Sequence, residues 1–242
     1  MLWEWRKYNM AKKQLSLRQK NLDIDIWIIT LITFGVFLLY EVMGNQLMAY
    51  VKEPENSLLS RLIINSGAQF GIAGLGVVVV CILRKEKFSL FGVVKQNTLK
   101  SIIGSVACFI PYLCYIFVSG QYEGYQPFDI LIADAVLKSG FPTNILGMSL
   151  IVVVWGFFEG FNYVVISDKL NSRYPSKNQW LDIGAITCAV IGILFHPLNI
   201  SFWGVLEIVT TFIALYGMLI VKKKTKNAWG CVFVFCFIWN AL

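Results

Sequence analysis

Charged side chains are scarce in this sequence. Of its 242 residues only 14% are charged, whereas 57% are hydrophobic, and the mean hydropathy is +0.65. A soluble domain carries roughly a quarter charged residues, so this composition excludes an ordinary water-soluble fold. The apolar runs are long and do not alternate with polar residues, which argues against a membrane β-barrel. Because lipid offers the backbone no hydrogen bonds, the sequence predicts an all-α, polytopic transmembrane helical bundle.

Residues that bind metals or form disulfides are also few. The chain has one histidine and six cysteines, and none of the cysteines forms a C-x-x-C pair. Most cysteines fall within apolar runs, where a free Cys behaves as a small apolar residue. There is no H-E-x-x-H motif, and one His with one Glu would leave a divalent ion short of ligands. We therefore expect no disulfide framework, no metal and no other cofactor.

Apolar runs of spanning length are abundant. A helix of about 20 residues crosses the hydrocarbon core of a bilayer, and seven runs come near that length. They cover residues 26–48, 62–83, 99–118, 145–167, 183–200, 202–221 and 227–242, the fifth and seventh being the least secure. The prediction is a single transmembrane domain over residues 26–242, preceded by a basic cytoplasmic tail, residues 1–25, without a cleaved signal peptide.

The distribution of Lys and Arg predicts the topology. Cytoplasmic loops of membrane proteins carry the excess of basic residues. With a cytoplasmic N-terminus, all but three of the 21 basic residues fall on inner segments, the exceptions being Lys52, Arg61 and Lys138. The formal charge of +7 is then a topology signal and a preference for anionic lipid of the cell membrane. No nucleic-acid partner is expected.

Small residues and one long loop complete the organisation. Gly156 and Gly160 form a G-x-x-x-G pair, and Gly67, Gly71 and Gly74 form a second small-residue face. In a bilayer such faces let helices approach closely. The outer segment, residues 119–144, contains an amphipathic stretch at 128–138. Two interpretations of this segment stay open: a surface connector, or a cover over a site that opens outward.

Ionisable side chains inside the predicted spans are rare, and each is costly in lipid. Glu41 and Glu207 fall toward the outer ends of their spans, where we assign them a structural role near the headgroups. Glu159 differs because Gly156 and Gly160 lie on either side of it, among aromatic residues. A neighbouring helix or a peptide can come near this carboxylate. Such surroundings suit a general base.

Two further polar residues lie at similar depth. His196 is the only histidine, and Pro197 after it biases the backbone away from helical geometry. Asn240 is an amide at the end of the last apolar run. Counted from the predicted cytoplasmic ends, Glu159 lies about 12 Å deep, and His196 and Asn240 lie about 20 Å deep. We expect a polar pocket near the bilayer middle, lined by the fourth, fifth and seventh spans.

These residues resemble the CAAX prenyl protease and bacteriocin-processing family of intramembrane, glutamate-dependent peptidases. The similarity runs from about the second span to the C-terminus. Its strongest part comprises residues 211–217, 224–225, 228–229 and 239–242. Residues 68–76, followed by 84–87 and 91–92, are similar to the early region of the family.

The family's E-E-x-x-x-R motif aligns with residues 159–164. With Glu159 as the first Glu, Gly160 replaces the second Glu and Val164 replaces the Arg. With Glu159 as the second Glu, Phe158 and Tyr163 take the other two places. The first alignment is preferred, because it puts Tyr163 where the family commonly has an aromatic residue.

The two other motifs of the family are also partly present. F-x-x-x-H becomes Gly192 to His196, which keeps the His, and H-x-x-x-N becomes Cys236 to Asn240, which keeps the Asn. The resemblance implies that Glu159 and His196 activate water and that Asn240 lies in the oxyanion site. Cys236, Tyr163 and Asn162 would support them.

The implied function is that of an intramembrane endopeptidase acting on a peptide or a membrane-anchored protein within membrane lipid. The replaced motif residues favour an alternative, an inactive pseudoprotease that binds a peptide or partner as a scaffold. A dyad of Cys236 with His196 is a third possibility, although an apolar setting disfavours the thiolate. A transporter is less favoured, because the sequence has no repeats and no paired broken helices.

Overall fold

The computed structural model describes residues 15–128, 130–178, 180–195 and 199–241. Within these ranges the ordered elements are helical and there is no strand, which confirms the all-α class. His196 lies outside the described residues. The predicted tail boundary at residue 25 falls inside a helix, because Ser16 caps a helix that begins at Leu17, its hydroxyl accepting from the N–H of Gln19.

Five helices among the described residues are long and apolar enough to cross a membrane. Three are single elements: α2 (Leu17–Lys52), α5 (Thr98–Ser119) and α10 (Phe202–Thr225). The second helix along the chain is continuous through α3 (Leu58–Phe70), η1 (Gly71–Leu75) and α4 (Gly76–Arg84). The fourth is continuous through α7 (Thr143–Ile151), η3 (Val152–Phe158) and α8 (Glu159–Arg173). They coincide with the five longest predicted runs. By length and composition, the chain is a multi-pass membrane protein.

The remaining two predicted runs form shorter helices. α9 (Ile183–Leu194) has 12 residues, which makes it about 18 Å long against a hydrocarbon core of about 30 Å. The last run divides into α11 (Trp229–Val234) and the π-helical η4 (Phe235–Trp239). Both short helices pack within the bundle, α9 against α8 and α10, and α11 against α5 and α8. Spanning length is therefore established for five helices.

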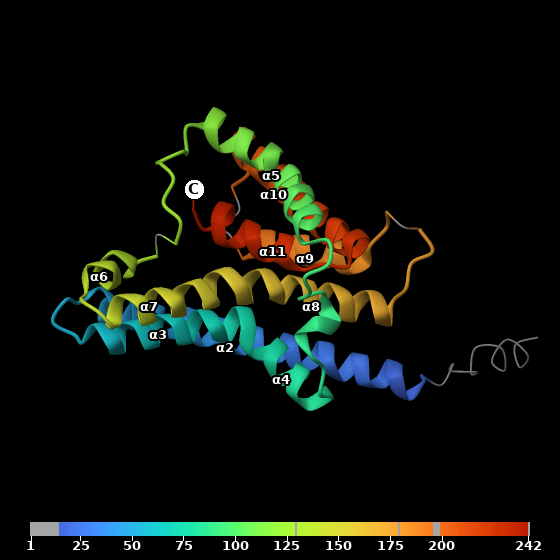
Figure 1. The fold of residues 1–242 in the computed structure, drawn as a ribbon, viewed down its shortest axis with the longest axis horizontal. Helices are drawn as coiled ribbons and strands as arrows, with labels where there is room; N and C mark the ends of the chain where they lie inside the picture. The colour runs from blue at the N-terminus through green and yellow to red at the C-terminus, as the bar shows by residue number, and fades with distance from the viewer. Residues whose placement is uncertain (1–14, 129, 179, 196–198, 242) are drawn as a thin grey trace, which may run out of the picture.

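Helix α8 occupies the centre of the arrangement. On one side it packs against α2, which also contacts α3, η1 and α4, and on the other it packs against α9 and α11 (Figure 1). α5 and α10 form the outermost pair on that second side. The short η2 (Phe88–Phe91) and α6 (Ala133–Lys138) lie in the connections. This order places η3 and α8 between two groups of helices.

Glycines allow the central helix to approach its neighbours. A Cβ atom at Gly160 would lie 2.8 Å from the carbonyl oxygen of Cys231, and one at Gly156 would meet the sulfur of Cys236. The predicted G-x-x-x-G face therefore packs against α11 and η4. In the second face, Gly71 packs against Val36 of α2 and Gly74 against Phe158 of η3, whereas Gly67 has open space around it. Gly76 is the glycine that allows backbone contact with α2, at 3.0 Å from the Cα of Ile29.

An ion-pair cluster of Asp25, Arg84, Glu86 and Lys169 ties three helices together at the end of the bundle where α2 begins. The buried Asp25 carboxylate lies 2.6 Å from Nε of Arg84 and 2.9 Å from Nζ of Lys169. Lys169, only 4% exposed, also pairs with Glu86 at 2.6 Å. Because each buried charge has a partner, the desolvation cost of the cluster is offset.

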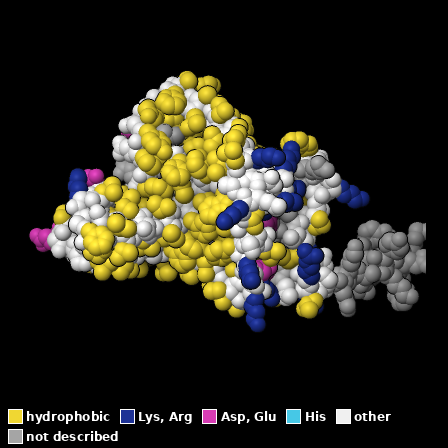
Figure 2. All heavy atoms as spheres, viewed as in Figure 1, with side chains coloured by type: hydrophobic (Ala, Val, Ile, Leu, Met, Phe, Trp, Pro, Cys, Tyr) yellow, Lys and Arg dark blue, Asp and Glu magenta, His cyan; other side chains and the backbone are white. Residues whose placement is uncertain are grey.

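Further ion pairs join the same end. They are Arg173 with Asp23, Lys222 with Asp168, and Lys223 with Asp182. Together with the ion-pair cluster, they bring the start of α2 and the ends of α4, α8 and α10 to one end of the molecule. Lys and Arg side chains gather at this end in Figure 2.

Large apolar side chains cover much of the surface shown in Figure 2. On α2 alone, Trp27, Leu31, Leu38 and Val42 are each more than 60% exposed. A soluble monomer rarely exposes contiguous apolar surface on this scale. Hydrocarbon tails would cover it without cost, in keeping with the membrane-spanning length of the helices.

Candidate functional site

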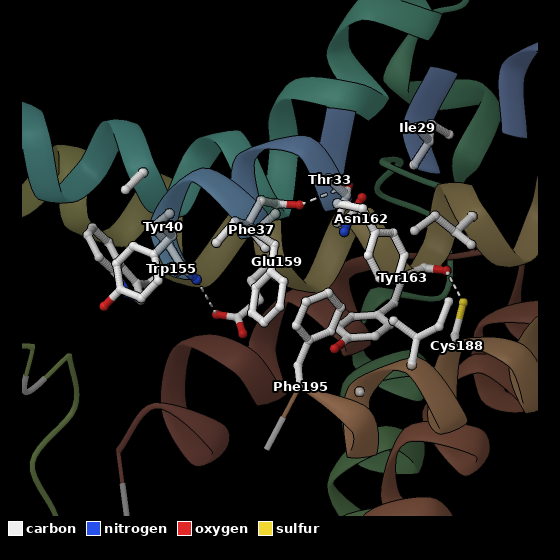
Figure 3. Close-up of a pocket in the computed structure, with 18 of the residues that line it drawn as sticks. Ile29, Thr33, Phe37, Tyr40, Trp155, Glu159, Asn162, Tyr163, Cys188 and Phe195 are labelled. Carbon is white, nitrogen blue, oxygen red and sulfur yellow. Dashed lines mark hydrogen bonds between the residues drawn. The ribbon is translucent and has the colours of Figure 1, made fainter. Parts of the chain in front are cut away.

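A cavity of ≈ 440 Å³ lies between α2, α3 with η1, η3 with α8, and α9 (Figure 3). From η3 and α8 it is lined by a stripe at helical spacing: Trp155, Glu159, Asn162, Tyr163 and Ile166. Three of the predicted site residues thus lie on one wall. The predicted fourth and fifth spans do line this cavity, whereas no described residue of the predicted seventh span does. α2 and α3, which the sequence did not implicate, form the facing wall.

Glu159 is held by two amide side chains through one of its oxygens. Its Oε2 accepts from Nδ2 of Asn240 at 3.2 Å and from Nε2 of Gln69 at 3.5 Å. Glu159 is only partly buried, and no donor among the described residues contacts its Oε1. The carboxylate is therefore oriented by donors from α3 and from the C-terminal end of the chain. One oxygen remains available to a molecule in the cavity.

Asn240 also bonds backbone carbonyls at two π-helical turns. Its Nδ2 donates to the carbonyl oxygen of Trp155 in η3 at 3.0 Å and to that of Phe235 in η4 at 3.1 Å. The N–H of Glu159 donates to the carbonyl of Gly156 instead of that of Trp155. A π-helical turn interrupts the ordinary hydrogen-bond ladder and is frequent at functional sites. The amide of Asn240 supplies a donor at this interruption.

The segment before α6 packs against the same region. The N–H of Phe128 donates to the carbonyl of Asn240 at 3.0 Å, and the N–H of Gln126 donates to the carbonyl of Ala241 at 2.9 Å. Phe128 is buried, and Ile130 and Leu131 line the cavity. This part of the outer segment therefore contributes to the cavity wall. α6 is the helix within the predicted amphipathic stretch.

The remaining predicted site residues lie as follows. Tyr163 lines the cavity and stacks on Phe235 at a centroid distance of 5.3 Å. Cys236 is buried against Gly156 and does not line the cavity. Nothing is described for His196, but Phe195 before it lines the cavity. Tyr163 therefore belongs to the cavity wall, and Cys236 belongs to the packing behind it.

Gly160 and Val164, at the positions aligned above with a Glu and an Arg, are closely packed. Gly160 lies against the backbone of α11, and Val164 is fully buried. Glu41 is exposed, and Glu207 accepts from the hydroxyl of Tyr115 at 3.3 Å, so both lie outside the cavity.

Gln69 and Thr33 are cavity residues that the sequence did not single out. Gln69 supplies a donor to Glu159, and the hydroxyl of Thr33 donates to the carbonyl of Ile72 in the π-helical η1 at 3.2 Å. A signal for Gln69 existed, since it is an amide in an apolar run with Gly67 and Gly71 on either side. Thr33 has no comparable signal.

The fold and the cavity together define a class: multi-pass helical membrane proteins with a carboxylate in a cavity between the helices. Comparison with protein-family models, with curated proteins and with solved structures found no match. Within the described ranges, no group of three or more His, Cys, Asp or Glu side chains is arranged to hold a metal ion.

Proposed function

We propose that this chain is an intramembrane endopeptidase, resembling the CAAX prenyl proteases, that cleaves a peptide or a membrane-anchored protein. One observation carries the proposal: the Glu159 carboxylate faces a cavity between helices of spanning length, held there by the amide of Asn240. A carboxylate at this place is costly unless it is used, which makes it a functional candidate by default.

The proposed topology is that of the cell membrane with a cytoplasmic N-terminus, and α9 and α11 with η4 complete a seven-segment bundle. The ion-pair cluster and the neighbouring basic residues would lie at the cytoplasmic boundary. Glu159 precedes Lys169 of that cluster by ten residues on one helix, which puts it about 15 Å inward. That depth is near the middle of a core about 30 Å thick.

The proposed chemistry uses Glu159 as the general base. Oε1 takes a proton from a water molecule while the water oxygen bonds to the scissile carbonyl carbon, and the carbonyl electrons move to its oxygen. Protonation of Glu159 weakens Oε2 as an acceptor, so the Asn240 hydrogen that Glu159 shares would turn to that oxyanion, while the other hydrogen stays with the Trp155 and Phe235 carbonyls. The C–N bond then breaks, and the leaving nitrogen takes the proton from Glu159. His196 would assist these proton transfers.

One observation favours the alternative, a scaffold without catalysis. The place of the second motif Glu is Gly160, where a Cβ atom would lie 2.8 Å from the Cys231 carbonyl oxygen. No carboxylate fits there without moving α11. The cavity and its polar wall would still hold a peptide.

Cleavage and binding by purified protein in lipid nanodiscs separate the two functions. The probe is a pool of apolar peptides, half of them ending in a farnesylated Cys-a-a-X sequence, read by mass spectrometry. The peptidase proposal predicts cleavage that Glu159→Gln abolishes and that Glu41→Gln, at an exposed carboxylate outside the cavity, leaves unchanged. Equal cleavage by Glu159→Gln would contradict it. Retention of peptides without cleavage would establish the scaffold.

A further inference from the structure

Two amides in the cavity wall lack a partner. Asn162 of α8 and Asn65 of α3 line the cavity, are partly buried, and form no hydrogen bond with any described residue. Gln69 and Asn240, by contrast, donate hydrogen bonds to the Glu159 carboxylate. An amide in an apolar cavity without a hydrogen bond costs free energy, so these two side chains are suited to a polar ligand.

Asn162 is the better placed of the two relative to Glu159. It follows Glu159 by three residues on α8, so the two side chains share a helical face and are separated by about 4.5 Å along the axis. Both are drawn on the cavity wall in Figure 3. A ligand group that reaches Oε1 of Glu159 therefore extends past Asn162 if it continues toward the ion-pair cluster.

The facing helix leaves Asn162 free for a ligand. The Lys169–Asp25 pair sets the antiparallel register of α8 and α2, and Thr33 then lies at about the same height as Asn162, 10–12 Å from that pair. The hydroxyl hydrogen of Thr33 is already given to the Ile72 carbonyl. Thr33 therefore has no donor to spare for the Asn162 side chain, and its oxygen, which could still accept, forms no hydrogen bond with Asn162.

We infer that Asn162 binds the backbone of an extended peptide next to the bond that Glu159 faces, and so makes the cavity selective for peptides over lipid chains. The inference deepens the proposed function and rests on it, because it names how the same cavity recognises its ligand. A primary amide offers donors and an acceptor, matching the N–H and C=O of a peptide unit. An extended peptide presents such a unit every 3.3 Å or so, within one or two residues of the Glu159 position.

A hydrocarbon ligand fits the apolar side of the cavity but not Asn162. Phe34, Phe37, Ile191 and Phe195 form that side, with the Phe195 ring packed on Phe37 at 5.0 Å and on Phe34 at 6.0 Å. These residues suit an apolar side chain of the peptide. An acyl or prenyl chain alone would leave the Asn162 amide unpaired, and a site built to hydrogen-bond an N–H discriminates strongly against ligands that lack it.

The test compares binding of two ligand pools to Glu159→Gln protein in nanodiscs, which holds ligands without cleaving them. One pool contains apolar hexapeptides of Ala, Val, Leu and Phe. The other has the same sequences with alternate backbone amides replaced by esters, which removes N–H donors. With Asn162 present, the protein should retain the amide pool about tenfold better than the ester pool, a difference equivalent to one or two hydrogen bonds. This comparison needs no change at position 162.

Variants then assign the preference to Asn162. Asn162→Leu in the same background should retain both pools equally, at the level of the ester pool. Asn45→Leu, an exposed amide on α2 outside the cavity, should keep the preference. Equal retention of the pools with Asn162 present, a preference that survives Asn162→Leu, or stronger retention of labelled oleate than of either pool would overturn the inference.

The two proposals fail separately. If wild-type protein never cleaves a peptide, the peptidase proposal falls, and the amide preference measured on Glu159→Gln protein still decides the role of Asn162. If cleavage depends on Glu159 but the amide preference is absent, only the inference about Asn162 falls.

Discussion

At the scale of single residues, Asn240 connects the last helix to the cavity. One side-chain nitrogen with two hydrogens is shared among the carboxylate of Glu159 and the carbonyls of Trp155 and Phe235. The backbone carbonyl of Asn240 accepts from the N–H of Phe128. The amide therefore satisfies two π-helical turns while it orients the Glu159 carboxylate, so its structural role and its proposed functional role fall on one residue.

Asn240→Ala should lower both stability and activity. The change leaves the carbonyls of Trp155 and Phe235 without the Asn240 donor and removes one of the two donors to the Glu159 carboxylate. This loss costs about 2 kcal/mol in the free energy of unfolding. Thermal unfolding in detergent measures this loss, and Asn45→Ala serves as the exposed-amide control. A stability equal to wild type would show that the Asn240 hydrogen bonds contribute nothing.

At the scale of helices, close packing depends on glycine at some positions and not at others. A Cβ atom at Gly160 would lie within 3.0 Å or less of the Cys231 backbone, whereas one at Gly67 would meet nothing within 4 Å. The two positions form a matched pair, because both are glycines in long apolar helices.

Gly160→Ala should therefore destabilise the protein by about 1–3 kcal/mol through overpacking, whereas Gly67→Ala should be neutral or slightly stabilising, since Ala is the better helix former. Unfolding midpoints in detergent compare the two variants. Equal effects of both would mean that α8 and α11 are not in contact at Gly160.

Breaking the buried ion-pair cluster should cost more stability than breaking an exposed ion pair. Lys169→Met leaves Asp25 and Glu86 without their shared cation and should cost about 3–5 kcal/mol. Lys138→Met breaks the exposed pair with Asp134, each 76% exposed, and should cost less than about 1 kcal/mol. The same unfolding assay measures both. A loss of less than about 1 kcal/mol in the free energy of unfolding for Lys169→Met would mean that the Lys169 ammonium group is exposed to water and not buried in the ion-pair cluster.

Asp182, at the start of α9, should make the stability of the fold depend on pH. Burial raises the pKa of this carboxyl, but the hydrogen bonds from Lys223, the Ala185 N–H and Asn171 outweigh it, and the net pKa is lowered. A lowered pKa stabilises the fold above the unfolded value of about 3.9, and this contribution is lost as the pH falls further.

The unfolding temperature of Asp182→Asn should therefore fall below that of wild type above pH 4, and the gap should narrow as the pH approaches 3. Glu41→Gln, at an exposed carboxylate, should show no comparable gap. A constant difference across this range would exclude titration of Asp182 as its cause.

At the scale of the whole molecule, the sequence predicted what depends on local composition. The all-α class and the five long helices follow from the apolar runs and from the need to satisfy backbone hydrogen bonds in lipid. The fifth and seventh runs are already short and the least secure in the sequence, but that α9 and α11 with η4 end below spanning length did not follow. An apolar run shows where a helix is permitted and not where it ends.

The facing wall of the cavity was also beyond the sequence. Thr33 and Phe37 of α2 and Gln69 of α3 reach the Glu159 cavity through the register between helices. That register is set by pairs such as Lys169 with Asp25, which are 144 residues apart in the chain. Local patterns contain no such long-range information.

The proposed function requires that the Glu159 carboxyl lies in a cavity within the membrane that a peptide can enter. An apolar carbodiimide partitions into lipid and modifies carboxyl groups that it can reach there, and mass spectrometry of proteolytic fragments locates the adduct. In proteoliposomes we expect the carbodiimide to modify Glu159, and we expect the apolar peptide pool to suppress this modification. An unmodified Glu159, or modification that peptides leave unchanged, would contradict it.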